Sequence, residues 1–307
     1  MSQPLVSVIM PNYNHSAYLP ARIESILGQT YPNFEVILLD DCSTDNSREV
    51  IAKYSSDPRV TNVVINEKNS GSTFVQWQKG FDIAKGEFIW IAESDDMADK
   101  NLLTKLVGKL CSVDNGVLAF GHSMMIDQDG KELPYSWDEP KNYDGKGIYD
   151  GKSFARHRMV YKNILYNASM IVFRKSCLSG VNPSYREYRY CGDWSFWFDI
   201  CCQGTVVEVP EKLNYFRQHT NKVSARSRLN GDDFKEQARC QLRIAEVLNL
   251  STYQMKCLRG RSTKRIRKSS VPNKQELIET YPLLYDGTKT DILLYEIDKI
   301  IGQSGMK

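Results

Sequence analysis

The stretch Glu87-Phe-Ile-Trp-Ile-Ala-Glu-Ser-Asp-Asp96 decides the fold. Residues 87–91 are mostly apolar and have the length of a buried strand, and carboxylates follow directly. The stretch Phe34-Glu-Val-Ile-Leu-Leu-Asp-Asp41 has the same design. We therefore expect two buried strands with Asp40-Asp41 and Asp95-Asp96 at their carboxyl ends.

Outward from these two strands, strand and helix signals alternate. Strands are expected at residues 5–10, 34–39, 60–65 and 87–91, and helices at residues 17–29, 46–54 and 72–84. Lys85-Gly86 predicts a glycine cap on the third helix. Such repeats indicate a mostly parallel sheet with helices on both faces, in which ligands bind beyond the carboxyl ends of the strands.

The second half of the chain has a mixed pattern. Strands are expected at 168–173 and 206–209, a helix at 193–202, and only helices beyond about residue 230. The predicted fold class is therefore α/β with a C-terminal helical extension. We expect a first domain at residues 1–228, with halves at about 1–110 and 111–228, and the extension at residues 229–307.

The composition is that of an ordinary globular protein. Of 307 residues, 41% are hydrophobic and 25% are charged, and the net charge of +3 argues against a dedicated nucleic-acid binder. The eight cysteines form no C-x-x-C pair, which fits reduced thiols. Neither a signal peptide nor an apolar run of membrane-spanning length is recognisable. We expect a cytoplasmic protein, with at most peripheral contact at the inner face of a membrane.

Adjacent carboxylates at the end of a buried strand repel each other, and a divalent cation relieves that repulsion. Asp95-Asp96 therefore predict a magnesium or manganese site, which would in turn bind diphosphate oxygens. The alternative is that the pair caps the helix expected at residues 99–110.

The second acidic pair points to a nucleobase. A carboxylate such as Asp41 can accept the ring N–H of uracil, thymine or guanine, and Tyr13, just after the first strand, could stack on that base. The alternative for Asp41 is turn chemistry in a tight loop. For Asp45 and Ser47 we expect helix capping.

Three segments together resemble family 2 glycosyltransferases of the GT-A fold: Ser7-Val-Ile-Met-Pro-Asn-Tyr-Asn14, Leu39-Asp-Asp-Cys-Ser-Thr-Asp45 and Glu93-Ser-Asp-Asp96. The resemblance is strong over residues 5–110 and traceable to about 225. It implies inverting transfer of a sugar from a nucleoside-diphosphate donor, with UDP- or dTDP-sugars favoured, to a glycan or lipid-linked glycan acceptor. Polysaccharide or surface-glycan synthesis is the implied setting. Residues 1–110 would bind the nucleotide and 111–228 the acceptor.

The resemblance also implies roles for single residues. Pro11 and Tyr13 lie in the nucleotide-binding segment, where the tyrosine stacks on the base. Asp41 would bind the base and Asp95 the ribose region. Asp96 would ligate Mn²⁺ or Mg²⁺ at the donor diphosphate.

An inverting transfer needs a general base that takes the acceptor's proton. The segment Tyr190-Cys-Gly-Asp-Trp-Ser-Phe-Trp197 resembles the one that carries this carboxylate, so Asp193 is the implied base. It departs from many relatives in having Gly192 where they have an acidic residue. The alternative for Asp193 is a helix cap. A second departure is Trp77-Gln78 in place of the family's Arg-Asn, so no arginine contact to the donor is expected there.

Leu213-Asn-Tyr-Phe-Arg-Gln-His-Thr-Asn-Lys-Val-Ser224 resembles the family's Tyr-Arg-x-His segment. A neutral imidazole at His219 would ligate the metal or bond the diphosphate, and Arg217 would pair with phosphate. The alternative for His219 is a polar surface residue. His15, His122 and His157 are expected to be ordinary polar residues.

Two further regions concern the acceptor. A loop at residues 127–151 contains Tyr135, Trp137, Tyr143 and Tyr149, and is a candidate acceptor platform. The basic stretch from Lys256 to Lys268 could face anionic lipid or a lipid-diphosphate acceptor, but a solvated helix face is the expected alternative.

Two other function classes fit the sequence less well. A nucleotidyltransferase should have a glycine-rich phosphate loop after its first strand, where this chain has Pro11-Asn-Tyr-Asn14. A non-catalytic nucleotide-sugar-binding relic would not need every acidic position, and all of them are present.

Overall fold

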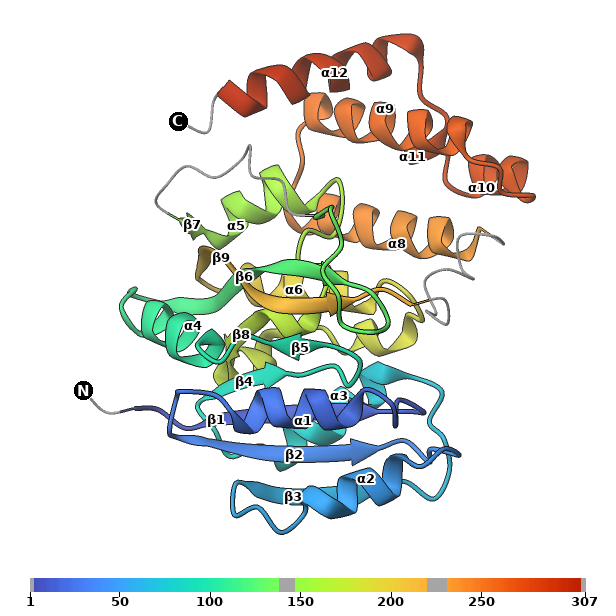
Figure 1. The fold of residues 1–307 in the computed structure, drawn as a ribbon. Coiled ribbons are helices and arrows are strands. Elements are labelled where there is room, and N and C mark those ends of the chain that lie inside the picture. Colours follow the sequence, from blue (N-terminus) through green and yellow to red (C-terminus); the bar gives the residue numbers. More distant parts are fainter. Residues whose placement is uncertain (1–2, 138–146, 220–230, 305–307) are drawn as a thin grey trace.

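The computed structural model describes residues 3–137, 147–219 and 231–304, and Figure 1 shows their arrangement. The strands are β1 (Val6–Asn12), β2 (Phe34–Asp40), β3 (Val60–Ile65), β4 (Phe88–Ile91), β5 (Met97–Ala98), β6 (Gly116–Ile126), β7 (Ile148–Asp150), β8 (Ile171–Arg174) and β9 (Thr205–Arg217). The α-helices are α1 (Leu19–Leu27), α2 (Ser47–Tyr54), α3 (Thr73–Ile83), α4 (Leu102–Cys111), α5 (Gly151–Phe154), α6 (Gly192–Cys201), α8 (Asp232–Val247), α9 (Thr252–Lys268), α10 (Lys274–Thr280), α11 (Pro282–Tyr285) and α12 (Lys289–Ser304). Shorter helical turns are η2 (Ala155–Met159), η3 (Ala168–Met170), η4 (Lys175–Gly180) and η5 (Pro183–Glu187).

The strands form one nine-stranded sheet in the order β3-β2-β1-β4-β8-β6-β9-β5, with β7 paired to β9. Strands β3, β2, β1 and β4 are parallel, as the sequence predicts. Beyond β4 the sheet is mixed, because β8 runs antiparallel to both β4 and β6 whereas β6 and β9 are parallel. The α/β fold and the C-terminal helices are confirmed.

Alternation along each buried strand produces a core on either face of the sheet. In β1, Ile9 faces one core, whereas Val8 and Met10 face the other. Helices α1, α2 and α4 cover the face of the sheet on which Val8 lies. Helices α3 and α6 cover the opposite face, on which Ile9 lies. Strands covered on both sides are mostly apolar, which explains their hydrophobic runs; polar exceptions such as Ser7 and Glu35 hydrogen-bond to each other.

The glycine cap expected at Lys85-Gly86 is wrong. Helix α3 ends at Ile83 with Ala84 as its C-cap, and Gly86 has no left-handed backbone. The Gly86 N–H instead donates to Ser7 Oγ at 2.8 Å, and a Cβ on Gly86 would lie 2.5 Å from the Ser7 nitrogen. Gly86 is therefore needed for a close approach of two chain segments rather than for ending a helix.

The C-terminal helices pack onto the rest of the molecule at the end of the sheet far from β3 (Figure 1). Phe234 and Ala238 of α8 and Leu258 of α9 belong to the same hydrophobic core as α3 and α6. The domain boundary expected at residues 228 and 229 lies outside the described residues and stays a prediction. In the described part of the chain, none of the helices combines the length and apolar character needed to cross a membrane.

The basic stretch of α9 is largely engaged inside this helical layer. Arg259 Nε lies 3.0 Å from Asp291 Oδ2, and Arg265 pairs with Asp233 at 3.4 Å. Lys264 pairs with Glu296. The expected solvated helix face is thus replaced for these residues by ion pairs between helices.

Candidate active site

Parallel pairing brings the carboxyl ends of β1, β2 and β4 to one edge of the sheet, in a region we call the strand-end rim. Asn12, the last residue of β1, lies beside Asp40, the last residue of β2. The loops that follow carry Tyr13, Asp41 and the acidic pair after β4. Pro11 is buried inside β1, whereas Tyr13 is 45% exposed and can present its ring to a ligand.

Asp41 is buried and is held by the segment that precedes α3. Its Oδ1 accepts hydrogen bonds from Asn66 Nδ2 at 2.6 Å and Gln76 Nε2 at 2.9 Å. Ser70 donates its backbone N–H to the same oxygen and its hydroxyl to Oδ2. The Asp41 N–H in turn donates to the carbonyl oxygen of Asn12, next to Tyr13. Asp41 and Tyr13 therefore belong to one hydrogen-bonded pair of loops.

Asp45 and Ser47 were both expected to take part in helix capping. Asp45 Oδ1 accepts the Ser47 N–H at 3.0 Å at the start of α2, and Oδ2 accepts the Ser16 N–H at 2.8 Å. Asp45 thus forms an Asx turn at the start of α2, whereas the N-cap is Asn46, which makes no side-chain capping hydrogen bond. The Ser47 hydroxyl is buried without a hydrogen-bond partner in the described structure, so its capping role is not seen.

Asp96, the predicted metal ligand, is fully buried behind the rim. Its Oδ2 accepts from Asn167 Nδ2 and Ser169 Oγ, both at 2.8 Å, and its Oδ1 accepts the Arg217 N–H at 3.1 Å. Burial raises its pKa to about 6, with a further rise from the charge of Asp95 and opposing contributions from Arg22 and the hydrogen bonds. Each oxygen thus accepts at least one hydrogen bond within the protein, and the metal-binding role of Asp96 stays a prediction.

Arg22 of α1 supplies the positive charge under the rim. It is fully buried, lies 4.9 Å from the ring centre of Trp90, and donates to Ser169 Oγ at 3.1 Å. Burial lowers its pKa to about 10, while Asp96 and Asp95 act in the opposite direction. Nothing in the amino-acid pattern pointed to Arg22, because its position on α1 reads as a surface arginine.

The Asp95 carboxylate lies close to the imidazole rings of His15 and His219. His219 Nε2 is 3.0 Å from Asp95 Oδ2, and one ligand atom each from His15, Asp95 and His219 lie within 4.8 Å of one another. The rings of His15 and His219 are 5.8 Å apart. The structure places His219 at the predicted site, and adds His15, which was expected to have no role. Its place in the loop after β1 is the signal that could have identified it.

His15 has the properties of a ligand. Its Nδ1 is 2.8 Å from Ser94 Oγ, and a ligating imidazole commonly uses its second nitrogen in such a hydrogen bond. Burial lowers the pKa of His15, Asp95 raises it and His219 lowers it again. A lowered pKa favours the neutral imidazole, which is the form that binds a cation.

Arg217 has a structural role in place of the expected phosphate contact. Its Nε donates to the Asp95 carbonyl oxygen at 2.7 Å, and its Nη1 donates to the carbonyl oxygens of Asp127 and Gln128. Its guanidinium also lies 4.7 Å from the ring centre of Tyr18. Arg217 is buried, so it fixes the backbone of the rim rather than facing a ligand.

Trp77 and Glu93 form a pair that the sequence did not suggest. Trp77 is buried and donates its ring N–H to Glu93 Oε1 at 3.0 Å, at the position where the family has an arginine. Burial raises the pKa of Glu93 to about 8; the charge of Asp95 raises it further and the Trp77 hydrogen bond lowers it.

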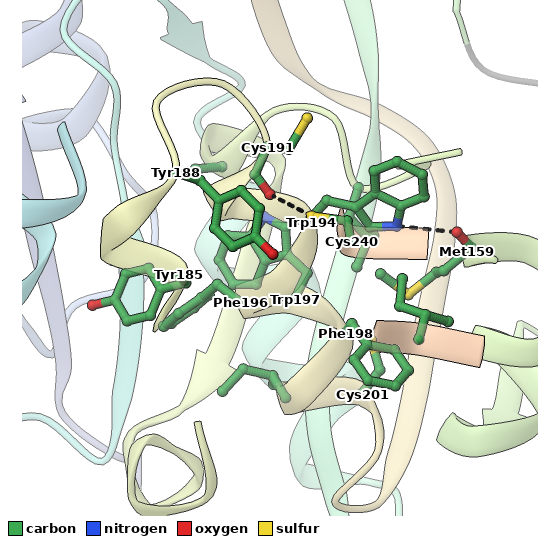
Figure 2. Close-up of a cluster of buried hydrophobic side chains, with 14 of the residues drawn as sticks. Met159, Tyr185, Tyr188, Cys191, Trp194, Phe196, Trp197, Phe198, Cys201 and Cys240 are labelled. Carbon is green, nitrogen blue, oxygen red and sulfur yellow. Dashed lines mark hydrogen bonds between the residues drawn. The ribbon is translucent and has the colours of Figure 1, made fainter. Parts of the chain in front are cut away.

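Asp193, the predicted base, lies in the first turn of α6. The residues on either side of it are anchored, since Cys191 O accepts from Cys240 Sγ at 3.4 Å and Trp194 donates its ring N–H to Met159 O at 3.0 Å (Figure 2). Its own carboxylate accepts from Asn163 Nδ2 at 2.8 Å and from the Trp194 N–H at 2.7 Å. Its neighbours therefore fix both its backbone and its side chain.

The environment of Asp193 suits proton transfer. Burial raises its pKa to about 7, although the hydrogen bonds from Trp194 and Asn163 oppose the rise. Asp193 is not fully covered, because it lines a cavity of about 1060 Å³. We call this the large cavity. It lies between residues 120–208 and the C-terminal helices, and His122, His157 and Trp137 also line it.

A short segment links Asp193 to the rim. Asn163 donates to Asp193, and Asn167, four residues on, donates to Asp96. Four residues of fully extended chain span at most about 14 Å. Asp193 and the rim are therefore held by the two ends of one short segment.

Of the aromatic loop, the structure describes Tyr135, Trp137 and Tyr149, while Tyr143 lies outside the described residues. Trp137 is 42% exposed and its ring packs at 5.3 Å from that of Tyr166 and 5.4 Å from that of Phe216. Because Trp137 also lines the large cavity, the loop reaches the side of Asp193, where an acceptor platform was predicted.

Comparison with known proteins places this geometry in context. A family model described as glycosyl transferase family 2 matches residues 7–176. TuaG of Bacillus subtilis, whose name is that of a teichuronic acid biosynthesis glycosyltransferase, is 35% identical over 224 residues, which are 73% of this chain and 82% of TuaG. An uncharacterised glycosyltransferase of Haemophilus influenzae is 27% identical over 226 residues, 72% of this chain and 68% of the relative.

Solved structures share the fold. S. aureus TarS residues 1–349, in complex with UDP-GlcNAc, superposes with a TM-score of 0.65 at 17% identity. The match covers 94% of this chain and 81% of TarS 1–349, so it includes the C-terminal helices as well as the sheet. The same TarS fragment without that ligand gives a TM-score of 0.63.

Proposed function

Because this chain belongs to glycosyl transferase family 2, we propose that it transfers a sugar, with inversion, from a UDP- or dTDP-sugar to an acceptor hydroxyl in surface-polysaccharide assembly. The observation that carries this proposal is the position of Asp193. A carboxyl with a pKa near 7 lines a cavity and is tied by one short segment to the rim where a nucleotide would bind.

The rim supports binding of a nucleoside diphosphate. Tyr13 offers an exposed ring for the base, next to the loop that Asp41 organises. Stacking and a carboxylate acceptor together suit a uracil or thymine ring, which has both a flat face and an N–H donor. Asp41 already accepts four hydrogen bonds, so its part in recognising the base would also be to hold the loop around it.

A divalent cation fits the group formed by His15, Asp95 and His219. We assign the metal to these three residues, in place of Asp96, because their ligand atoms lie within 4.8 Å of one another, whereas Asp96 is fully buried behind the rim. One carboxylate and two imidazoles suit Mn²⁺ better than Mg²⁺, which prefers oxygen ligands throughout. A cation held there would supply electrostatic stabilisation of the departing diphosphate.

Side chains of this protein would carry out the rest of the reaction. Asp193 would accept the proton of the acceptor hydroxyl as that oxygen attacks the anomeric carbon, on the face opposite the leaving diphosphate. Asn163 and the Trp194 N–H hold the carboxylate in one orientation for that step. Buried Arg22 and Asn167 keep Asp96 and the rim in place beneath the donor.

A thermal-shift screen tests the donor assignment. UDP, dTDP and GDP would be compared, each with and without manganese. UDP or dTDP with manganese should raise the melting temperature more than either component alone, because a ligand that binds only the folded state stabilises it. If GDP raised the melting temperature and UDP and dTDP did not, the base would be guanine rather than uracil or thymine. If no nucleotide raised it, the proposal would be overturned.

A further inference from the structure

The large cavity has a wall built by the C-terminal helices. Tyr253 and Arg261 of α9 and Tyr295 and Lys299 of α12 line it opposite Asp193. A smaller cavity of about 350 Å³ adjoins it, since Arg261, Arg265, Tyr295 and Lys299 line both. The hollow therefore runs from the proposed base out along α9 and α12.

The lining of this hollow is positively charged. In the described residues, six cationic side chains line the large cavity against three acidic ones, and five line the smaller cavity against one. Part of this charge is compensated. Arg158 lies 2.7 Å from Glu208, and Arg265 lies 3.4 Å from Asp233.

Arg261 and Lys299 differ from these paired cations. Among the ion pairs of residues 3–137, 147–219 and 231–304, none joins either side chain to a carboxylate. Burial lowers the pKa of Arg261, Tyr295 opposes this, and the like charge of Arg265 lowers it again. Gathered cations without matching carboxylates are stabilised by an anionic ligand.

Aromatic side chains line the large cavity together with these cations. Tyr161, Tyr166, Tyr190, Tyr253 and Tyr295 line the large cavity together with Trp137. Tyrosine combines an apolar ring face with a hydroxyl that can donate or accept. A chain of sugars, which offers both C–H faces and hydroxyl groups, matches such a lining.

We propose that the C-terminal helices form the acceptor site, and that the acceptor is a glycan chain bearing anionic groups. Its charged repeats would lie along Arg261 and Lys299, with the reacting hydroxyl at Asp193. This inference rests on the proposed function, because it names the acceptor class of the same site. Carboxylate and phosphate are the two sources of the negative charge that the lining would recognise.

A bilayer surface fits the observations less well. Most of these cations, among them Arg261 and Arg265, are partly covered where they line the hollow, and only Lys268 and Lys299 of the described lining cations are exposed. The neighbouring Arg259 and Lys264 of α9 are paired with Asp291 and Glu296. A membrane would contact protruding, unpaired lysines and arginines.

Binding by the full chain, with UDP and manganese present, tests the proposal. Three labelled probes of equal length would be compared by fluorescence anisotropy: oligoglucuronate, oligo(glycerol phosphate) and a neutral malto-oligosaccharide. At least one anionic probe should bind about tenfold more tightly than the neutral probe, and added salt should weaken that binding. The anionic probe that binds identifies the charged group.

The matched variants are Lys299→Glu and Lys289→Glu, which make the same charge change on α12. Lys289 is exposed and lines neither cavity. Lys299→Glu should weaken the anionic probe about tenfold, whereas Lys289→Glu should change it less than about twofold. Affinity for UDP with manganese should stay unchanged in both, and Lys268→Glu provides a second cavity variant if Lys299→Glu does not fold.

Three results would overturn the proposal. Equal affinity for neutral and anionic probes would show that the acceptor is not recognised by its charge. Equal losses of affinity in Lys299→Glu and Lys289→Glu would show that the acceptor does not bind in this cavity. Binding to anionic lipid vesicles that Lys299→Glu abolishes, with no glycan probe bound, would assign the hollow to a membrane. Failure of UDP binding with intact probe binding would instead contradict only the donor function.

Discussion

The strand-end rim and the large cavity are opposite in charge and in construction. The rim gathers Glu93, Asp95 and Asp96 next to the buried arginines Arg22 and Arg217, on loops fixed by parallel strands. The large cavity gathers arginines, lysines and tyrosines from a turn of the first domain and from helices at the chain's end. Under the two proposals, the substrates would be selected by opposite counter-charges, a cation at the rim and an anion in the cavity.

Asp193 lines the large cavity and is linked to the rim through Asn163 and Asn167, and changing it should have the largest effect. Asp193→Asn should lower the rate of sugar transfer by about 10²–10⁴-fold, because a general base is lost while the shape is kept. Binding of UDP with manganese, measured by calorimetry, should persist. Asp298→Asn is the control, since Asp298 lines the same cavity and accepts from the Tyr161 hydroxyl.

The pH profile gives the same prediction a second readout. Because the pKa of Asp193 is raised to about 7, its carboxylate form is lost as the pH falls below that value. The transfer rate should then fall about tenfold per pH unit on the acid side. A profile that is flat from pH 5 to pH 8, or equal losses in Asp193→Asn and Asp298→Asn, would rule Asp193 out as the base.

The second prediction separates the two aspartates of the rim. Asp95→Asn should weaken manganese-dependent UDP binding by about 10–100-fold, as expected for a lost ligand. Asp96→Asn should leave that binding nearly intact. It should instead cost about 1–3 kcal/mol of unfolding free energy, because its amide nitrogen would face either the donors of Asn167 and Ser169 or the Arg217 N–H.

Isothermal titration of UDP and thermal melts of both variants give the two quantities. The reverse result, with Asp96→Asn losing metal-dependent binding and Asp95→Asn keeping it, would restore the metal assignment to Asp96. His15→Ala sharpens the test, because only the structure-based assignment predicts that this histidine affects metal binding.

A smaller effect is expected at Tyr13. Base stacking contributes about 1–3 kcal/mol, so Tyr13→Ala should weaken UDP binding by about 5–100-fold. Tyr13→Phe keeps the ring and should bind nearly as well as the unchanged protein. Since Tyr13 is exposed, the melting temperature should not change in either variant. Unaltered UDP affinity in Tyr13→Ala would place the base elsewhere.

The smallest effect concerns stability. The pKa of Glu93 rises from 4.5 to about 8 on folding, so stability present below pH 4.5 is lost as the pH rises through 8. Glu93→Gln keeps an oxygen acceptor for Trp77 and removes that loss. The melting temperature of Glu93→Gln minus that of the unchanged protein should therefore increase from pH 5 to pH 9. The increase should be about 2–4 °C for each kcal/mol of unfolding free energy that the unchanged protein loses over this range. A constant difference would show that Glu93 titrates normally.

The strands of the first half were predictable because burial on both faces leaves a plain signal. β2 and β4 are continuous apolar runs, and their ends carried the acidic pairs. β6 was missed, since Gly121, His122 and Ser123 interrupt its apolar residues. β9 was expected at 206–209 but extends to Arg217, where polar side chains such as Asn214 are buried against hydrogen-bond partners.

The candidate site was predictable where a residue lies within a motif. Asp41, Asp95, Asp193 and His219 were found in this way, and their roles stay predictions. His15 and Arg22 were not found, because their importance comes only from folding, which brings them to residues about 80 and 150 positions away. Which aspartate of a pair points outward is likewise set by tertiary hydrogen bonds that a local pattern does not contain.

The shared hydrophobic core of α3, α6, α8 and α9 limits how this protein can be re-engineered. Phe234 and Leu258 fill the same core as Trp194, beside the proposed base. A chimaera that exchanged the last 75 or so residues for those of a relative would therefore have to re-fit the packing around the base at the same time. New acceptor preference should be sought first through side chains facing the hollow, because those changes leave the shared core intact.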